Sequence, residues 1–362
     1  MKRIWIQRIG AAVLCAVLLA GCIPGGPAAD STASADPLTG QEQQYPGQRP
    51  AAVVIDNAPG STTQWGIGSA SVVLEAAARA DTAPSLCLVY PSVSAMPTVG
   101  PVTLGQDLFW RLLSGQQVLP IQRGCDLYTR NFLDYWNLRA VDALETGRNA
   151  FTTGNTDWAS PLWCTNGQSV AKVLGSLSLS SALSEDPAES ADSTQKGDTP
   201  AVPTVPALLP QQTDGHLPDA DAADAVQAAV QFPSGSTTRF AYDTDTGTYG
   251  MLHNDGSPQL DANTGTQAAF DNLLVLYSAS TLRDDGRTLD YDLTMGGGLW
   301  LNGGHLWHIT WTQGTGSTFA FYDADGRPLR ILSGRSYIAW LSSLTGEEVT
   351  VQDSAGNDLL QS

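Results

Sequence analysis

The chain has 362 residues, of which 42% are hydrophobic and 15% charged, and it contains 10 tryptophans. This composition supports one large core or two modest ones, and it excludes a wholly disordered chain, a collagen and a multi-span membrane protein. Without residues 1–21, which carry Lys2, Arg3 and Arg8, 15 basic groups face 36 acidic groups, a net charge of −21. Such a surface repels phosphate backbones, so we expect no nucleic-acid partner.

The N-terminus predicts a secretory signal that ends at a lipid-attachment cysteine. Three basic residues precede the apolar segment 9–20, which is too short to span about 30 Å of hydrocarbon. The segment closes with Leu19-Ala20-Gly21-Cys22, which resembles a bacterial lipobox; the alternative is an ordinary signal peptide with an incidental cysteine. We expect cleavage after residue 21 and a diacylglyceryl anchor on Cys22 that holds the protein on the extracytoplasmic face of the cell membrane.

Changes in composition divide the mature chain into four parts. Residues 22–47, rich in Pro, Gly, Ala, Ser and Gln, predict a disordered tether. Residues 48–182 predict an N-terminal α/β-like domain, because apolar strands alternate with helical segments. Residues 183–206 predict an acidic, Ser/Pro-rich linker, and residues 207–362 a C-terminal β-rich domain.

In the first half of the mature chain, predicted strands alternate with predicted helices. A run that is apolar on both faces indicates a central strand covered on both sides, as at 51–55. We expect further strands at 86–90 and 118–121, and helices at 72–80, 104–113 and 128–136.

The second half predicts an antiparallel meander, so the fold class is α+β. Short aromatic and β-branched segments are separated by Asp-Gly or Asn-Gly pairs, which supply the positive φ of tight hairpins. These pairs are Asp255-Gly256, Asp285-Gly286, Asn302-Gly303 and Asp325-Gly326. The expected strands include 299–301, 305–311, 319–322 and, at the end of the meander, 337–341.

Ordered blocks along the mature chain resemble the YerB-like extracytoplasmic lipoproteins, a family whose domain has no assigned function. The blocks are Pro37 to Gly40, Arg49 to Asn57, Gln64 to Glu75, Gly100 to Val102, Tyr242 to Tyr249, Asp261 to Gly265, Gly296 to Gly298 and Phe321 to Gly326. The resemblance implies a three-layer arrangement of sheets and helices formed by both halves.

The chain departs from the family pattern at its polar positions. Thr103 and Gln106 stand where the family carries arginines, and Ala83-Pro84 stands where it has a Thr-Arg pair. A family histidine corresponds to Gln122 or Arg123, and a His-Asn pair to the region 160–163. If the family cleft binds an anion through these groups, this chain has lost most of the donors, and its cleft binds something else or nothing.

Five residues are candidates for ligand binding. Asp56 and Asn57 end a buried strand, where open α/β sheets hold ligands, and Glu75 supplies a second carboxylate. The alternative is an Asx-type turn with Glu75 in a structural role. Trp158 and Trp163 occupy a loop-like stretch and could stack on a sugar, whereas core packing is the role expected of most tryptophans here.

No pattern indicates a metal, a cofactor or assigned catalytic residues. His305 and His308 lie on an alternating strand and point to opposite faces. The segment that begins at Asp243 lacks the glycine and glutamate of a calcium loop, because Thr248 and Asn254 stand there. Nucleotide-binding loops, nucleophile elbows and zinc-protease motifs do not occur in the sequence.

Three cysteines remain once Cys15 leaves with the signal and Cys22 carries lipid. Cys87 lies in an apolar strand and predicts a buried small hydrophobe. Cys125 and Cys164 fall where the family's His-bearing segments would approach one cleft, so the resemblance implies a disulfide between them in an oxidising compartment. Three independent reduced thiols are the alternative.

These features predict a lipid-anchored, non-enzymatic binding or scaffolding protein of the bacterial cell envelope, with an unidentified protein or glycan partner. The first alternative is an envelope hydrolase that cleaves cell-wall glycan with Asp56 and Glu75 as paired carboxylates in an open cleft. The second alternative, solute capture for a transporter, requires a deep pocket between two lobes.

Overall fold

The computed structural model describes residues 34–58, 63–154, 161–184, 202–213, 217–314 and 317–360. The predicted signal, the lipidation site Cys22, residues 22–33 of the tether, most of the linker, and Trp158 lie outside these residues. The rest of the predicted tether, residues 34–47, is described, and Leu38 within it is fully buried in a hydrophobic core, so this part packs against the fold.

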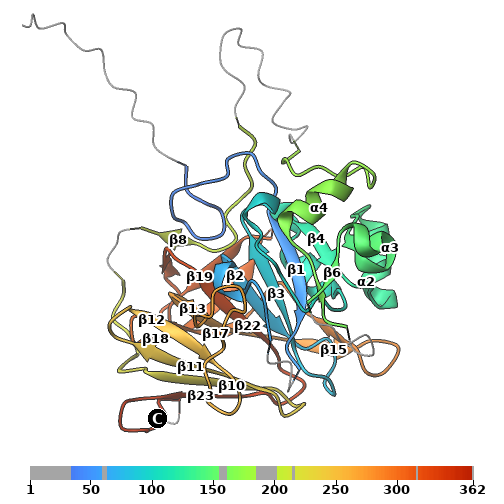
Figure 1. Ribbon diagram of the computed structural model, residues 1–362. Helices are drawn as coiled ribbons and strands as arrows, with labels where there is room; N and C mark the ends of the chain where they lie inside the picture. The colour runs from blue at the N-terminus through green and yellow to red at the C-terminus, as the bar shows by residue number, and fades with distance from the viewer. Residues whose placement is uncertain are drawn as a thin grey trace, which may run out of the picture. The chain divides into compact units, whose positions relative to one another are not determined.

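Twelve strands of the described chain form one mixed sheet, in which strands from both halves are hydrogen-bonded (Figure 1). Their order across the sheet is β20, β19, β18, β17, β14, β22, β2, β3, β1, β4 and β5, and β9 pairs with β18. The halves meet where β2 runs parallel to β22, with Val72 opposite Ser336 and Ala76 opposite Trp340. The bounds are β1 (Ala51–Asp56), β2 (Val72–Ala76), β3 (Ser85–Tyr90), β4 (Leu119–Gln122), β5 (Val141–Asp142), β9 (Ala222–Ala223), β14 (Asn272–Ser278), β17 (Met295–Asn302), β18 (His305–Gln313), β19 (Phe319–Tyr322), β20 (Pro328–Leu329) and β22 (Ser336–Ser342).

A second, antiparallel sheet of the described chain has the order β13, β12, β11, β10, β23, and three short strand pairs complete the β structure. The bounds of this sheet are β10 (Gln227–Gln231), β11 (Thr237–Asp243), β12 (Thr248–Leu252), β13 (Ala269–Phe270) and β23 (Glu348–Gln352). The short pairs are β6 (Thr152–Thr153) with β7 (Trp163–Cys164), β8 (Gln211–Gln212) with β21 (Ile331–Leu332), and β15 (Ser280–Leu282) with β16 (Leu289–Tyr291).

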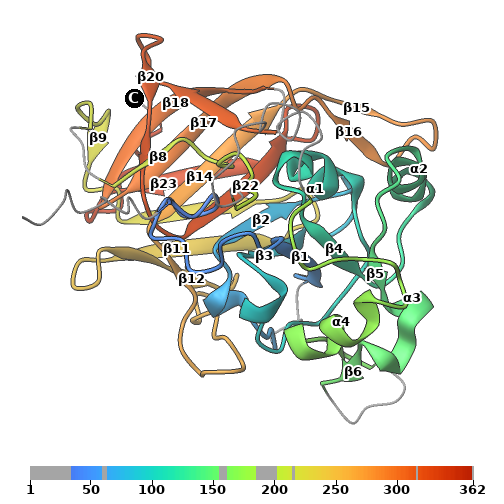
Figure 2. The same ribbon diagram turned by 90° about the horizontal axis from the view of Figure 1, so that it is seen from above.

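The helices are short and lie beside the β1–β4–β5 side of the large sheet (Figure 2). They are α1 (Asp107–Leu112), α2 (Leu127–Tyr135), α3 (Ala143–Thr146) and α4 (Gly167–Leu174), with 3₁₀ turns at Ile67–Ser69, Val93–Ala95, Ser114–Gln116 and Gly147–Asn149. The predicted helices at 104–113 and 128–136 are confirmed as α1 and α2. The Asp126 side chain caps α2 by accepting a hydrogen bond from Thr129 N, 2.7 Å.

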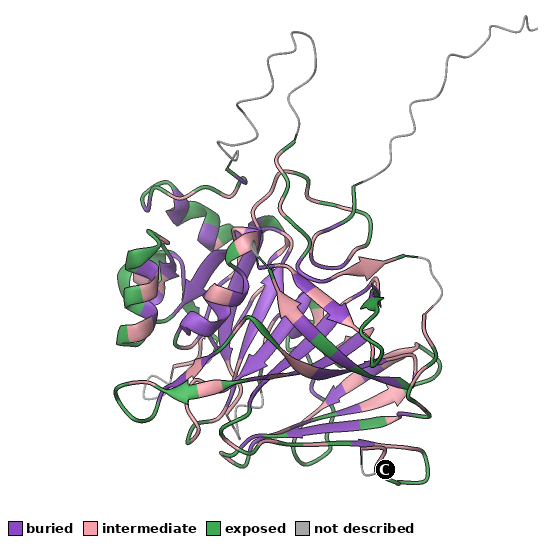
Figure 3. Ribbon diagram, turned by 180° about the vertical axis from the view of Figure 1, so that it is seen from behind, coloured by how far each residue is buried: buried purple, intermediate pink, exposed green. Residues whose placement is uncertain are grey.

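Two hydrophobic cores lie on opposite faces of the large sheet, and β1 contributes to both. Val53 packs in the core that includes residues of α4 and the five-stranded sheet, and Val54 packs in the core that includes α1. Successive strand residues point to opposite faces, so a strand covered on both sides must be apolar throughout. Figure 3 shows this continuous burial along the central strands. The predicted α+β class with its three layers is confirmed.

The helix predicted at 72–80 is wrong, because residues 72–76 form the buried strand β2. Alanine favours helices, and this preference motivated the prediction. The segment instead lies between β3, with which it is antiparallel, and β22, with which it is parallel. Burial on both faces favours the β-branched pair Val72-Val73 in a strand, and tertiary packing overrides the helical propensity.

The hairpin turns agree with the sequence, whereas the end of the meander does not. Gly256, Gly286, Gly303 and Gly326 all adopt positive φ. Gly303, for example, has φ +57° in the turn between β17 and β18, which permits the predicted tight hairpin. The segment 337–341 does not extend the antiparallel meander: it belongs to β22, which is parallel to both of its neighbours.

Candidate functional site at the end of strand β1

Glu75 lies in β2 and is completely buried, at 0% exposure. Its carboxylate accepts hydrogen bonds from Asn57 Nδ2 at 2.6 Å, from Thr238 Oγ1 at 2.9 Å and from the hydroxyl of Tyr337. The donors come from the turn after β1, from β11 and from β22, so one side chain connects both sheets. A buried carboxylate is tolerated only when such donors replace the water that it loses.

This enclosure changes the acidity of Glu75. Burial raises the pKa of Glu75 to about 7, although the hydrogen bonds from Tyr337, Thr238 and Asn57 act in the opposite direction. Burial also raises the pKa of Tyr337, and the adjacent carboxylate raises it further. The tyrosine therefore remains a donor to Glu75 near neutral pH.

Two glutamines extend the hydrogen-bonded chain away from Glu75. Gln64 Nε2 donates to Asn57 Oδ1 at 3.0 Å and to Asp56 O at 2.8 Å. Gln259 Nε2 donates to Gln64 Oε1 at 2.7 Å, and both glutamines are buried. The polar cluster therefore comprises Asn57, Gln64, Glu75, Thr238, Gln259 and Tyr337. Gln64 lies in a family-like block and Tyr337 in an expected strand, but no sequence pattern pairs them with Glu75.

Asp56 has a local role in the structure. Its Oδ1 accepts a hydrogen bond from Ala58 N at 3.0 Å, which closes an Asx turn after β1. Asp56 is half-buried, whereas Glu75 has no exposed surface. Because Glu75 has no exposed surface, the described residues form no open cleft between these two carboxylates, which the hydrolase alternative requires.

The dipeptide Pro101-Val102 connects the backbone of Trp163 to that of Asp56 through one hydrogen bond on each side. Asp56 N donates to Pro101 O at 2.9 Å, and Val102 N donates to Trp163 O at 2.7 Å. The guanidinium of Arg123 lies over the Trp163 ring, 5.8 Å from its centroid. The indole nitrogen of Trp163 is buried without a hydrogen-bond partner among the described residues. The structure therefore brings four of the five predicted ligand-binding residues to one end of β1, and it adds Arg123, whose role the sequence did not predict.

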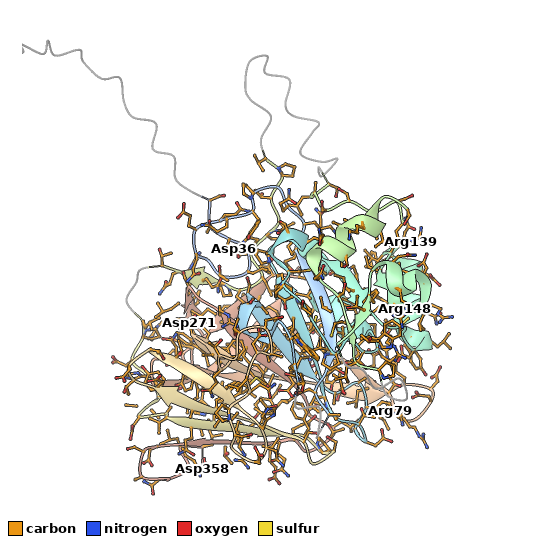
Figure 4. The ribbon with its side chains drawn as sticks, viewed as in Figure 1. Asp36, Arg79, Arg139, Arg148, Asp271 and Asp358 are labelled. Carbon is orange, nitrogen blue, oxygen red and sulfur yellow. The ribbon has the colours of Figure 1, made fainter. Side chains whose placement is uncertain are left out.

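A second buried cluster fixes the segment that leads into β2. Asp261 accepts hydrogen bonds from Gly66 N at 3.1 Å and Gly68 N at 2.8 Å. Arg335 donates to the carbonyl oxygens of Ile67, Ala70 and Ala269 at 2.9, 2.8 and 2.7 Å. These side chains come from the second half of the chain and bind backbone groups of the first half, except that Arg335 also binds Ala269 of the second half. Asp271, which is labelled in Figure 4, accepts a hydrogen bond from Arg335 N at 2.8 Å.

Cys125 and Cys164 are free in the structure, so the disulfide predicted between them is not formed there. The Cys164 thiol donates to Leu162 O at 3.8 Å, and the Cys125 thiol is half-buried. Cys87 is fully buried in β3, which confirms the prediction for that residue.

We expect purified protein to contain three free thiols, those of Cys87, Cys125 and Cys164. Burial raises the pKa of all three, which lowers the thiolate fraction that disulfide exchange requires. Alkylation under denaturing, non-reducing conditions followed by mass spectrometry counts them. Alkylation of Cys87 alone would contradict the structure and restore the predicted disulfide.

Helices of the described chain are all too short or too polar to cross a membrane.

Sequence comparison identifies the family. A profile described as "Protein of unknown function (DUF3048) N-terminal domain" matches residues 38–179, and its C-terminal counterpart matches residues 228–338. The chain belongs to the DUF3048 family.

A Bacillus protein of similar sequence is named as a lipoprotein. "Putative lipoprotein YerB" of Bacillus subtilis (strain 168) is 26% identical over 321 residues, which cover 87% of this chain and 88% of the relative. The crystal structure of YerB from Bacillus subtilis superposes with a TM-score of 0.70 at 20% identity, and covers 87% of this chain and 99% of that one. The predicted resemblance to YerB-like proteins is confirmed, and the structural match confirms the fold.

Proposed function

We propose that the protein is a lipid-anchored binding or scaffolding protein on the extracytoplasmic face of the bacterial cell membrane. The observation that carries the proposal is the sequence Leu19-Ala20-Gly21-Cys22 after a short apolar segment, followed by a stretch rich in Pro, Gly, Ala and Ser at 23–34. The related Bacillus protein, which bears the name of a lipoprotein, supports the same anchor.

The surface that we propose for ligand binding lies at the end of β1. Asp56, Asn57 and Trp163 come together there, and Arg123 presents a cation over the indole ring. Glu75 lies beneath this surface and orients Asn57 through the 2.6 Å hydrogen bond. A buried carboxylate whose oxygens already accept three protein hydrogen bonds supports a positioning role for Glu75 rather than direct contact with a substrate.

The anchor is tested by replacing the cysteine. Cys22→Ser removes the sulfur that carries the lipid, so we expect the protein to appear in the medium or to accumulate as an uncleaved precursor. Fractionation of cells into membrane and soluble material, with mass spectrometry of the N-terminus, measures this. Unchanged membrane retention of a normally cleaved Cys22→Ser chain would overturn the anchor.

The binding surface is tested with a defined envelope material. The full-length protein is incubated with purified peptidoglycan, and the bound fraction is measured after sedimentation. If the stacking surface binds glycan, we expect Trp163→Ala to reduce binding several-fold, since aromatic contacts contribute about 1 kcal/mol each. Trp136→Ala is the matched control, because Trp136 is 60% exposed at the end of α2 and away from β1. Equal binding by both variants and the parent would remove Trp163 from the proposed surface.

A further inference from the structure

Exposed apolar side chains gather on and around α2 and α3. Among the described residues, ten large hydrophobic side chains are exposed, and five of these lie between residues 104 and 144. The five are Leu104, Leu127, Tyr135, Trp136 and Leu144, which are between 55% and 80% exposed. The other five are spread over residues 202–344. Single exposed apolar residues are ordinary, whereas a gathered set marks a surface that contacts a partner.

Leu104 and Leu144 meet over Gly124, although they come from different elements. A Cβ on Gly124 would lie 2.8 Å from Leu144 Cδ1 and 3.6 Å from Leu104 Cδ2, so glycine leaves room for both side chains. Asp142 Oδ1 accepts hydrogen bonds from Gly124 N and from Leu144 N, each at 2.8 Å. The start of α3 is therefore fixed beside the turn that leads into α2.

Two aromatic residues continue the apolar surface at the end of α2. Tyr135 is the last residue of α2, Trp136 follows it, and their ring centroids lie 5.3 Å apart. Trp136 also contacts Phe132, one helical turn earlier, with 6.4 Å between ring centroids. Figure 1 and Figure 2 both show α2 and α3 at the same outer side of the fold. We call the surface formed by Leu104, Leu127, Tyr135, Trp136 and Leu144 the α2–α3 edge.

The α2–α3 edge also differs in charge from the rest of the chain. Residues 104–148 contain five basic and five acidic groups, whereas the remainder of the mature chain contains ten basic and 31 acidic groups. Arg123, Arg130, Arg139 and Arg148 are all exposed, and Figure 4 labels the last two at this side of the fold. The edge can therefore approach anionic lipid headgroups, which repel the acidic remainder.

The residue types of the edge suit the interface of a bilayer. Tryptophan and tyrosine have an apolar body and a polar tip, so they are enriched where headgroups meet acyl chains. Leucine adds apolar area, and the long stem of arginine carries its charge toward lipid phosphates.

The proposed anchor keeps a bilayer within reach of this edge. Cys22 is twelve positions from Ser34, where the described chain begins, and an extended chain of that length spans about 40 Å. Docking of the fold on the same bilayer is then an intramolecular step with a high effective concentration of lipid, so a small contact suffices.

We propose that the α2–α3 edge docks on the phospholipid bilayer in which Cys22 is anchored. The leucines and the two aromatic rings of the edge enter the headgroup region, the exposed arginines bind lipid phosphates, and the acidic remainder faces away. The inference rests on the proposed anchor, for which it names the surface of the fold that contacts the lipid.

Quenching of tryptophan fluorescence by brominated lipid tests the docking. The lipidated mature protein is reconstituted in phosphatidylcholine vesicles that contain a minority of phosphatidylglycerol, with or without bromine on the acyl chains. Bromine quenches only indoles that reach the bilayer, so we expect to lose the emission of one indole out of the nine that remain when Trp5 leaves with the signal. Trp136→Phe keeps an aromatic ring on the edge and should show no loss on bromination. Purified peptidoglycan contains no bilayer, so Trp136→Ala remains a control for glycan binding.

Charged substitutions identify the edge. The double variant Leu127→Glu, Leu144→Glu places two carboxylates there and should abolish the quenching. Its thermal midpoint should be unchanged, because both leucines are exposed at the first turn of a helix, where a negative charge is favourable. Leu260→Glu is the matched control, because Leu260 is exposed in the connection between β12 and β13; it should retain the quenching.

Flotation of the vesicles and mass spectrometry of the N-terminus separate docking from anchoring. A chain that carries lipid on Cys22 and floats, but shows no quenching, overturns the docking and leaves the anchor intact. Quenching that persists in Trp136→Phe or in the folded double variant also overturns the docking, because another surface then contacts the bilayer. Absence of quenching together with cross-linked dimers that the double variant abolishes would assign the edge to a second copy of the chain. A chain without lipid on Cys22 overturns the anchor and the docking together.

Discussion

Between pH 4.5 and pH 7, Glu75 is expected to lower the free energy of unfolding of the parent protein by about 3 kcal/mol. Glu75→Gln should not show this decrease. The magnitude follows from a pKa that burial raises from 4.5 to about 7, at about 1.4 kcal/mol for each unit. Glutamine suits the site because its oxygen accepts from Asn57 and Thr238 while its amide donates to the Tyr337 oxygen.

The sign follows from proton binding. Between pH 4.5 and pH 7 the folded protein holds a proton on Glu75 that the unfolded chain has released, so the folded state is favoured as pH falls. The contribution is complete below pH 4.5 and is lost as the pH rises through 7. Above that range both states are ionised, and the difference no longer changes.

Urea unfolding of both proteins at a series of pH values from 4.5 to 8 measures this contribution. Other titrating groups affect parent and variant equally, so the difference between the two curves isolates Glu75. Glu348→Gln, the same substitution at an exposed position of β23, is the matched control. Parallel curves for the parent and Glu75→Gln would show that the carboxylate is not enclosed as described.

Arg335→Met is expected to lower the free energy of unfolding by about 3 kcal/mol or more. The substitution keeps the apolar stem and removes donors to three carbonyl oxygens, those of Ile67, Ala70 and Ala269. Hydrogen bonds to a charged group contribute about 1.5–3 kcal/mol each, and buried acceptors without a donor add to the cost. The stacking of the guanidinium on Phe270, 5.0 Å from the ring centroid, is lost as well.

Urea unfolding at pH 8, where Glu75 is ionised in both proteins, measures the effect of Arg335→Met without a contribution from that carboxylate. Arg327→Met is the matched control, because Arg327 is exposed and its ion pairs lie within one hairpin; we expect a change below 1 kcal/mol. A loss in Arg335→Met no larger than in this control would contradict the role of Arg335 in joining the two halves of the chain.

Strands and turns whose structure depends on neighbouring residues in the chain were predictable from the sequence. The strand at 51–55 is apolar at every position, and the hairpin glycines follow Asp or Asn, so both patterns indicated their structures directly. The same local reasoning failed at 72–76, where alanines suggested a helix. The decisive fact there is that β22 lies beside β2, and the partner residues in β22 are more than 250 positions away in the chain.

In the candidate site, too, features set by neighbouring residues were predictable and features set by distant residues were not. Asp56 and Asn57 were predictable because they end a buried strand, and the Asx turn at Asp56 was the stated alternative. The enclosure of Glu75 was not predictable, since its donors Thr238 and Tyr337 are separated from it by 163 and 262 positions. A lone glutamate in an apolar segment does not reveal whether it faces a cleft or a set of buried donors.

We propose that Asp56 and Glu75 serve a binding protein and not a glycan hydrolase. The most direct measurement is the release of soluble fragments from purified peptidoglycan by the full-length protein, followed by chromatography with mass detection. We predict that the parent, Asp56→Asn and Glu75→Gln proteins all release no more than a control without protein, because Glu75 is enclosed and cannot reach a substrate. Fragment release by the parent that both substitutions abolish would contradict the account.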